Sequence, residues 1–253
     1  MDKKLANKVV IVTGASKGIG AGVAKQMGAE GAKVVVNYSS NKSDADCVVN
    51  EITENGGTAI AIQGDVSKSQ DVIRIFEETK KVFGGLDVLV NNAGVYWATP
   101  LADFTEDAYR KMFDVNVLGT LLASQAALKL FDGKGGSIIN ISSVAAKDPE
   151  NTLSVYGATK AALSLLTTSL SRELGPNNIR VNSILPSMVL TEGLASLGLV
   201  ANTDNPYIGL MTSRTALGRL ATTEDIGNVA VFLSTDEASM VSGQEIAVSG
   251  AFK

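Results

Sequence analysis

The chain has 253 residues and contains no histidine, which excludes several kinds of active site. A Ser-His-Asp triad, a Cys-His pair, a zinc ion held by histidine and acid–base catalysis by an imidazole all need that side chain. If the protein is an enzyme, a different group must transfer its protons.

The chain also has only one cysteine, no excess of positive charge and no long apolar runs. The single Cys47 cannot form an internal disulfide, which favours a bystander thiol in a reducing compartment. With 22 Lys and Arg against 26 Asp and Glu, the chain offers no basic field for nucleic acid. Its apolar runs, such as Val9–Val12, are too short to span a membrane, and its first residues lack the apolar stretch of a signal peptide. We therefore expect a cytoplasmic protein with no nucleic-acid or membrane partner.

What the chain does contain is a regular alternation of two hydrophobic patterns. Hydrophobic residues make up 45% of the chain and charged residues 19%, as in globular proteins. Short β-branched runs alternate with longer amphipathic stretches, which predicts right-handed crossovers and a mostly parallel sheet with helices on both faces. We predict one doubly wound Rossmann domain of α/β class over residues 1–253. The expected strands are Val9–Val12, Val34–Val36, Ala59–Ile62, Val88–Val90, Ile138–Ile141 and Val181–Leu185.

One segment, residues 187–215, departs from this alternation. It is rich in Leu, Met and Ala, and it contains three glycines and the pair Asn205-Pro206. Such a segment either packs on the core as a helical excursion or forms a mobile lid over a pocket. Its position after the sixth expected strand favours a substrate lid.

The first expected strand leads into a glycine-rich turn that indicates a dinucleotide. The pattern G-x-x-x-G-x-G lies within Thr13–Gly20. Small residues there let the backbone approach a pyrophosphate, and the next helix offers its N-terminal N–H groups and positive dipole end. Three glycines alone are a weak signal, but their place between the first strand and the first helix makes the signal strong.

Four motifs occur in an order that resembles a known family. They are Thr13–Gly20, Asn91–Gly94, the set Ser143…Tyr156-x-x-x-Lys160, and Pro186. Together they resemble the short-chain dehydrogenase/reductase family, from about Lys8 to Val248. The family usually has Pro-Gly where this chain has Pro186-Ser187, and Asp-Gly-Gly where this chain has Ser249-Gly250-Ala251 after Val248.

The tip of the second strand bears on the choice between NADP and NAD. An acidic residue there usually binds a free ribose 2′-hydroxyl, whereas this chain has the neutral Asn37, followed by hydroxyl groups and Lys42. Lys17, in the glycine turn, could reach a 2′-phosphate, which Lys and Ser can bind. The two lysines could also be ordinary solvated charges. We predict NADP(H) in preference to NAD(H).

The resemblance also implies which residues form the cofactor site. Asp65 and Val66 would line the adenine pocket, the turn after the fourth strand would lie against the adenosine ribose, and Val189 and Thr191 would contact the carboxamide and phosphates. The expected cofactor-binding residues are Gly14, Ser16, Lys17, Gly18, Ile19, Gly20, Asn37, Tyr38, Ser39, Asp65, Val66, Asn92, Ala93, Gly94, Tyr156, Lys160, Pro186, Val189 and Thr191.

Tyr156 and Lys160 are four residues apart in a helical pattern, so they share one helix face. Such a pair alone is more often on the surface, but Ser143 ends the preceding strand, where crevices open in such sheets. A ketone that accepts hydride develops negative charge on its oxygen and needs a proton donor. A phenol titrates near pH ~10, and an adjacent ammonium and a cationic nicotinamide would lower that pKa. In a chain without histidine, Tyr156 is then a credible acid/base.

The resemblance implies a role for each member of this set. Tyr156 is the acid/base, Ser143 hydrogen-bonds the substrate oxygen, and Lys160 binds the nicotinamide ribose and lowers the pKa of the tyrosine. The family's spacing between serine and tyrosine selects Ser143 over Ser142. Asn116 would hold a water that links Lys160 to solvent, or it is an ordinary polar residue in a helix. No metal site is expected.

The expected pocket wall is apolar, which favours a hydrophobic ketone or aldehyde over a sugar. We therefore predict an NADPH-dependent carbonyl reductase that acts on a small-molecule carbonyl substrate. Trp97 could equally belong to the core or to an interface. The expected wall residues are Val95, Tyr96, Trp97, Val144, Ala145, Ala146, Met188, Leu190 and Leu194.

Two other functions compete with this prediction. A 3-oxoacyl-carrier-protein reductase, a close relative, would need a basic surface for its acidic partner. Lys129, Lys134 and Arg172 could contribute to one, but the chain is net acidic. A dinucleotide-sensing regulator without catalysis need not keep the serine, tyrosine and lysine, which are all present.

Two long helical patterns, Asp107–Phe131 and Ser154–Leu174, are rich in Ala, Leu and Ser. Members of the family pair these helices between subunits, and the resemblance therefore implies a homotetramer. Alternatively, both helices only cover the sheet.

Overall fold

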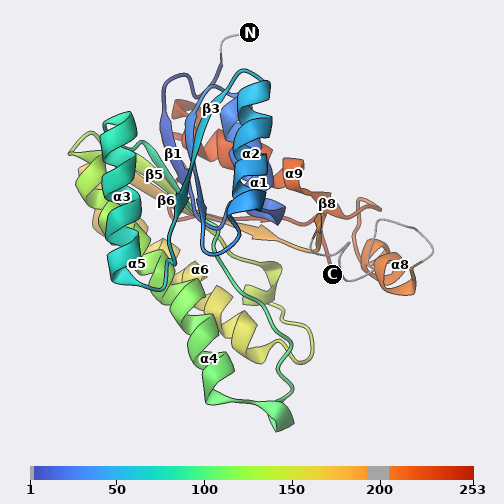
Figure 1. Cartoon of the computed structure of the whole chain (residues 1–253). Coiled ribbons are helices and arrows are strands. Elements are labelled where there is room, and N and C mark those ends of the chain that lie inside the picture. The colour runs from blue at the N-terminus through green and yellow to red at the C-terminus, as the bar shows by residue number, and fades with distance from the viewer. Residues whose placement is uncertain (1–2, 193–204) are drawn as a thin grey trace.

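The computed structural model describes residues 3–192 and 205–253, and its centre is a parallel β-sheet (Figure 1). Among these residues, seven strands form the sheet in the order β3-β2-β1-β4-β5-β6-β9. The order reverses between β1 and β4, where a crevice opens at the carboxyl ends of the strands. The six predicted strands are confirmed, whereas β9 was not predicted. The strands are β1 (Val9–Val12), β2 (Lys33–Tyr38), β3 (Thr58–Gln63), β4 (Val88–Asn91), β5 (Gly136–Ile141), β6 (Ile179–Pro186) and β9 (Glu245–Val248).

Hydrophobic residues alternate between the two faces of the sheet and join a layer of helices to each face. On β1, Val10 and Val12 belong to one core layer, and Val9 and Ile11 belong to the other. The first layer contains α1 (Gly18–Ala29), α2 (Lys42–Glu54) and α9 (Thr223–Ser234); the second contains α3 (Ser69–Phe83), α5 (Gly119–Phe131) and α6 (Ser154–Leu174) (Figure 1). The predicted doubly wound α/β fold is confirmed.

The helical pattern expected over Asp107–Phe131 is not one continuous helix. It consists of α4 (Glu106–Phe113), a π-helical turn η2 (Asp114–Leu118) and α5. The side chain of Thr105 caps α4 by accepting a hydrogen bond from the N–H of Ala108. A π turn inserts an extra residue into the helical repeat, and here that insertion contains Asn116.

The described parts of the predicted lid hold short elements that pack near the C-terminus. β7 (Val189–Leu190) pairs with β8 (Ala221–Thr222), and α8 (Pro206–Ser213) buries Ile208 and Met211 in a small apolar cluster. Residues 193–204, which include Leu194, lie outside the described residues. The remaining short turns are η1 (Leu101–Asp103), η3 (Val144–Ala146), η4 (Gly175–Asn177) and η5 (Asp236–Ala238).

Candidate active site

A cavity of about 950 Å³ opens at the carboxyl ends of the central strands. This volume is at the upper end of the range of about 300–1,000 Å³ for ligand pockets. The cavity brings residues after β1, β2, β3 and β4 together with the start of α6. The predicted cofactor residues in its wall are Gly14, Ser16, Lys17, Gly18, Ile19, Gly20, Asn37, Ser39, Asp65, Val66, Asn92, Ala93, Gly94, Tyr156, Lys160 and Thr191.

The glycine turn between β1 and α1 packs closely against the segment after β4. Gly14 has a φ of +61°, and a Cβ added to it would lie 2.8 Å from the Cα of Ala93, so a larger residue is excluded on both counts. A Cβ on Gly20 would overlap the side-chain amide of Asn92. That amide donates hydrogen bonds to the carbonyls of Thr13 and Gly14. Asn92 thereby holds the turn in place beside the cavity.

The N-terminus of α1 already binds an anionic group. Its N-cap residue, Lys17, makes no side-chain capping bond, and the N–H of Gly18 donates to the carboxylate of Glu192 at 3.2 Å. Free N–H groups and the helix dipole favour negative charge at this position. The residues present therefore fit a dinucleotide whose pyrophosphate would bind at the start of α1.

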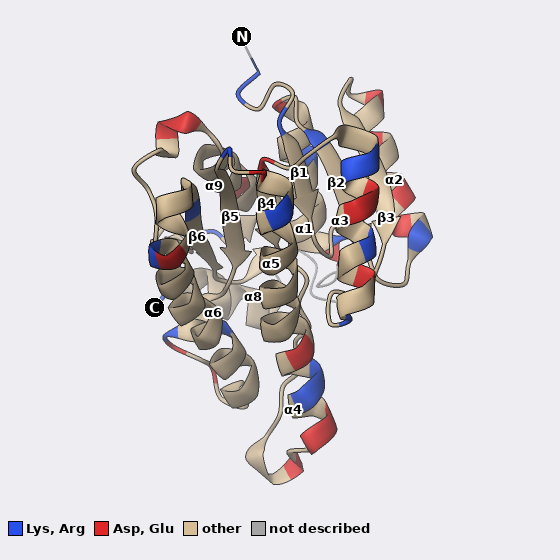
Figure 2. Ribbon diagram, turned by 90° about the vertical axis from the view of Figure 1, so that its left-hand side faces the viewer, with Lys and Arg blue, Asp and Glu red and all other residues tan. Residues whose placement is uncertain are grey.

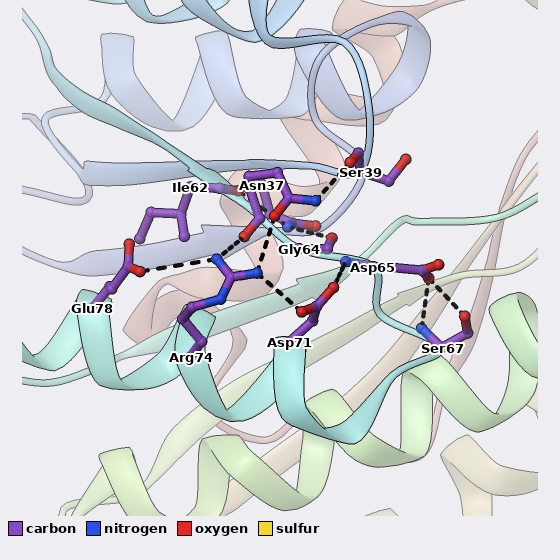
Figure 3. A network of polar contacts seen from close by, with 10 residues as sticks. Asn37, Ser39, Ile62, Gly64, Asp65, Ser67, Asp71, Arg74 and Glu78 are labelled. Carbon is purple, nitrogen blue, oxygen red and sulfur yellow. Dashed lines mark hydrogen bonds and ion pairs between the residues drawn. The ribbon is translucent and has the colours of Figure 1, made fainter.

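Asn37, predicted to face the cofactor, uses its side chain to hold the backbone around the crevice (Figure 3). Its Nδ2 donates to the carbonyls of Ile62 and Gly64 at 3.2 and 3.1 Å, and its Oδ1 accepts from the N–H of Gly14 at 3.1 Å. Both amide hydrogens are thus committed to the backbone. Asn37 lies in the cavity wall, but the exposed side chains at this tip are those of Ser39 and Ser40, and the choice of cofactor stays a prediction.

Two other residues near this tip do not lie as expected. Tyr38 is buried in the core layer of α1, α2 and α9, and it does not form part of the cavity wall. The ammonium of Lys42 pairs with Asp46 one turn further along α2, at 2.6 Å, and it does not line the cavity. Of the two lysines considered for a 2′-phosphate, only Lys17 lies in the cavity wall.

A polar network behind the tip was not predicted (Figure 3). Arg74 on α3 donates to the carbonyl and side chain of Gln63 and pairs with Asp71, which accepts from the N–H of Asp65. Asp65 also accepts from the N–H and hydroxyl of Ser67. Burial acts to raise the pKa of Asp65, but the bonds from Ser67 and nearby lysines outweigh it and lower that pKa. Asp65 is therefore a carboxylate in the cavity wall.

Tyr156 and Lys160 lie together on α6, as their spacing predicts. The Nζ of Lys160 lies 5.7 Å from the ring centroid of Tyr156 and donates to the carbonyl of Ile141 at 2.8 Å. The Ser143 hydroxyl lies near the phenol of Tyr156 and acts to lower its pKa, and it accepts from the N–H of Ala145 at 3.1 Å. The hydroxyl of Ser142 instead donates to the backbone carbonyl of Lys160. Ser142 lines the cavity, whereas Ser143 lies outside its wall, so the catalytic role of Ser143 stays a prediction.

Burial of the phenol governs the pKa of Tyr156 in this structure. It raises that pKa to about 12, and the nearby Ser143 hydroxyl only partly opposes this effect. Burial also lowers the pKa of Lys160 to about 8. The predicted lowering of the tyrosine pKa by Lys160 together with a bound nicotinamide stays a prediction. Tyr156 is consequently a neutral phenol, and thus a proton donor, near neutral pH.

Asn116 lies in the π turn η2 and is fully buried. Its Oδ1 accepts from the N–H of Val95, and its Nδ2 donates to the carbonyl of Val95 and the hydroxyl of Thr159. Thr159 in turn donates to the carbonyl of Tyr156 at 2.7 Å. Asn116 therefore connects the segment after β4 to α6, and its contact with a water stays a prediction.

Some predicted residues lie outside the cavity wall. Pro186 and Val189 are buried elsewhere, and Met188 and Leu190 pack against the apolar cluster of α8. Of the predicted substrate wall, Val95 and Tyr96 line the cavity, whereas Trp97, Val144, Ala145 and Ala146 do not.

The wall also contains residues that were not predicted to bind the cofactor or substrate. Asn41 could have been found from the sequence, because Asn directly before a helical pattern is a typical N-cap, and its side chain accepts from the N–H of Asp44. The others carry no local signal. The unpredicted residues are Ser40, Asn41, Asp44, Gly64, Lys111, Val115, Ile141 and Ser142.

Comparisons with known proteins agree with this arrangement. A family model described as enoyl-(acyl carrier protein) reductase matches residues 14–252, and an uncharacterised oxidoreductase of Methylorubrum extorquens is 48% identical over 99% of both chains. The chain is a short-chain dehydrogenase/reductase. This short-chain dehydrogenase/reductase is also 38% identical to 3β-hydroxysteroid dehydrogenase 1 of Eggerthella lenta, over 97% of this chain and 94% of the relative.

A solved structure gives the same result for the fold. A 7α-hydroxysteroid dehydrogenase complexed with NADH and 7-oxo glycochenodeoxycholic acid superposes with a TM-score of 0.91 and 35% identity, covering 99% of this chain and 96% of that one. The short-chain dehydrogenase/reductase is thus an oxidoreductase that acts on CH–OH or C=O groups with a nicotinamide dinucleotide.

Membrane-spanning helices and metal sites are both absent from residues 3–192 and 205–253. No helix in these ranges is long and apolar enough to cross a membrane. The same residues contain no group of His, Cys, Asp and Glu side chains that could hold a metal ion.

Proposed function

We propose that this short-chain dehydrogenase/reductase is an NADPH-dependent carbonyl reductase that converts a hydrophobic ketone or aldehyde reversibly into an alcohol. The observation that carries this proposal is the placement of the Tyr156 phenol in the cavity wall, with Ser143 nearby and the Nζ of the buried Lys160 over its ring. Since burial keeps Tyr156 protonated, the site offers the proton donor that carbonyl reduction needs.

Each side chain of the site has its own role in the proposed reduction. Ser143 and Tyr156 donate hydrogen bonds to the carbonyl oxygen and orient it. When bound, the dihydronicotinamide supplies the hydride that the carbonyl carbon accepts. Tyr156 transfers its proton to the oxygen as negative charge develops there, while Ser143 continues to hold that oxygen. Lys160, as an ammonium, would stabilise the phenolate that remains and bind the nicotinamide ribose hydroxyls.

The preference for NADP is supported by the groups around the tip of β2. Ser39, Ser40 and Asn41 line the cavity there, and Lys17 lines it from the start of α1. Hydroxyl groups and an ammonium can bind a 2′-phosphate. Asp44 also lines this region, so its charge must be outweighed by that of Lys17 and the N-terminus of α2.

A hydrophobic substrate is supported by the wall near Tyr156. Val95, Tyr96, Val115 and Ile141 all line the cavity, and the relatives that are named as hydroxysteroid dehydrogenases act on hydrophobic molecules. A 3-oxoacyl-carrier-protein reductase remains the competing function, and substrate comparison separates the two.

We also propose a homotetramer assembled through α5 and α6. Figure 2 shows few charged residues on these helices, in contrast to α2 and α3. Leu121, Leu128 and Leu165 are 36%, 37% and 73% exposed, and burial between subunits would remove this apolar surface from water. Light scattering tests this assembly, and a mass near 26.3 kDa would contradict it. The lone, exposed Cys47 is consistent with a cytoplasmic enzyme.

The proposed activity is tested by following NADPH absorbance with an aryl ketone, an acetoacetyl thioester and a crotonyl thioester. We expect the fastest oxidation of NADPH with the aryl ketone. Tyr156→Phe should lower turnover by roughly 10²- to 10⁴-fold without weakening NADPH binding. Tyr109→Phe removes a hydroxyl outside the cavity wall and serves as the control. Near-normal turnover in Tyr156→Phe would refute the mechanism, and a strong preference for either thioester would reassign the substrate.

A further inference from the structure

Tyr96 connects the candidate catalytic tyrosine to the solvent end of the cavity. Its ring meets that of Tyr156 edge to face, with centroids 5.1 Å apart and an interplanar angle of 87°. Tyr96 lines the cavity and is nevertheless 58% exposed. It lies in the segment between β4 and η1, whose start is held by the bonds between Val95 and Asn116. A large aromatic surface is therefore fixed beside the reacting position while remaining open to a ligand.

We propose that the exposed ring of Tyr96, held edge to face against Tyr156, acts as an aromatic clamp that selects flat ketones in which the carbonyl is fused or conjugated to a ring. This inference rests on the proposed reductase function. Such a ketone buries the exposed tyrosine surface while its oxygen reaches Tyr156, and aromatic pairs contribute beyond the area that they bury. An open-chain ketone gains no ring contact. The apolar neighbours Val95 and Val115 provide no partner for substrate hydroxyl groups, which further favours a ring hydrocarbon skeleton.

The clamp is tested with 1-tetralone and 2-octanone as paired substrates. Wild type should have the higher kcat/KM for 1-tetralone. Tyr96→Leu should lower that value by about 2- to 10-fold, as expected for loss of one aromatic pair, and should lower the value for 2-octanone less. Tyr96→Phe keeps the ring and should behave as wild type.

Binding gives a readout that does not depend on turnover. Calorimetry should show that 1-tetralone binds to the NADP⁺-loaded enzyme and that Tyr96→Leu weakens this binding. Trp97→Leu, the control, changes the next aromatic residue, which lies outside the cavity wall. It should leave the binding unchanged. Binding without reduction would refute the proposed function but support the clamp. Three results would each overturn the clamp. They are no binding of 1-tetralone, an equal loss of kcat/KM for both ketones in Tyr96→Leu, and the same loss of binding in Trp97→Leu.

Discussion

The backbone N–H of Gly18 donates a hydrogen bond to the carboxylate of Glu192 at 3.2 Å. These residues are 174 positions apart in the chain, and the fold brings the second to the helix terminus that the first begins. A carboxylate there occupies the position that suits a phosphate. Cofactor binding therefore has to displace Glu192.

Glu192→Gln should consequently bind NADPH more tightly. A negative charge at a helix N-terminus is stabilised by about 0.3–1 kcal/mol, and the variant loses this stabilisation of its unbound form. The Kd for NADPH should therefore fall by roughly 2- to 5-fold. Isothermal titration measures this directly. Glu224→Gln makes the same charge change in the first turn of α9, outside the cavity wall, and should leave the Kd unchanged. An equal gain in both variants would mean that only net charge matters.

Lys17→Ala should reduce the preference for NADPH over NADH by about 10-fold, because a charge-assisted bond to the 2′-phosphate is lost. Lys42→Ala is the matched control, since Lys42 is paired with Asp46 and lies outside the cavity wall. Initial rates with both cofactors give the ratio. If Lys42→Ala had the larger effect, the site of the 2′-phosphate would have to be moved to α2.

Two substitutions at the tip of β2 should change different properties, one the cofactor preference and the other the stability of the fold. Ser39→Asp places a carboxylate on an exposed cavity residue, so it should shift the preference towards NADH. Asn37→Asp should leave the preference unchanged and lower stability by about 1–3 kcal/mol, because a buried side chain loses its donors to the carbonyls of Ile62 and Gly64. Cofactor kinetics and urea unfolding check the pair. A switch to NADH in Asn37→Asp alone would show that this side chain reaches the ribose.

Lys160→Met should be more stable than wild type near pH 7, by on the order of 1–3 kcal/mol, and inactive. The pKa of Lys160 falls from 10.5 to about 8 on folding, so below pH 8 folding carries the full cost of burying the charge. Between those two values the unfolded chain binds more protons than the folded chain. The stability of wild type therefore rises with pH there.

Urea unfolding at several pH values tests this dependence. The difference between Lys160→Met and wild type should shrink as the pH rises from about 8 towards 10. Lys81→Met, on the exposed side of α3, is the control and should show no such trend. A difference that stays constant with pH would mean that repacking, and not removal of a buried charge, stabilises the variant.

Much of the fold could be predicted because its information is local. The strand Val9–Val12 is a β-branched run that is buried on both faces, and such runs indicate parallel strands from the sequence alone. β9 was missed because Glu245–Val248 is short and only partly buried, so its sequence lacks that signature. It becomes a strand by pairing with β6.

Part of the candidate site could also be predicted from the sequence, because it depends on local spacing. Tyr156 and Lys160 share a helix face because four residues make about one helical turn, and this holds wherever the helix lies. The sequence alone also set which proton-transfer groups were available, since a chain without histidine cannot use an imidazole. Those properties depend only on residue identity and spacing.

Tertiary structure decided what surrounds those groups. The inward turn of Asn37, the carboxylate of Glu192 at α1 and the contact of Tyr96 with Tyr156 all join segments far apart in the chain. The raised pKa of Tyr156 likewise depends on how much protein encloses it. Hydration and packing are properties of a residue's three-dimensional neighbours, and spacing along the chain carries no information about them.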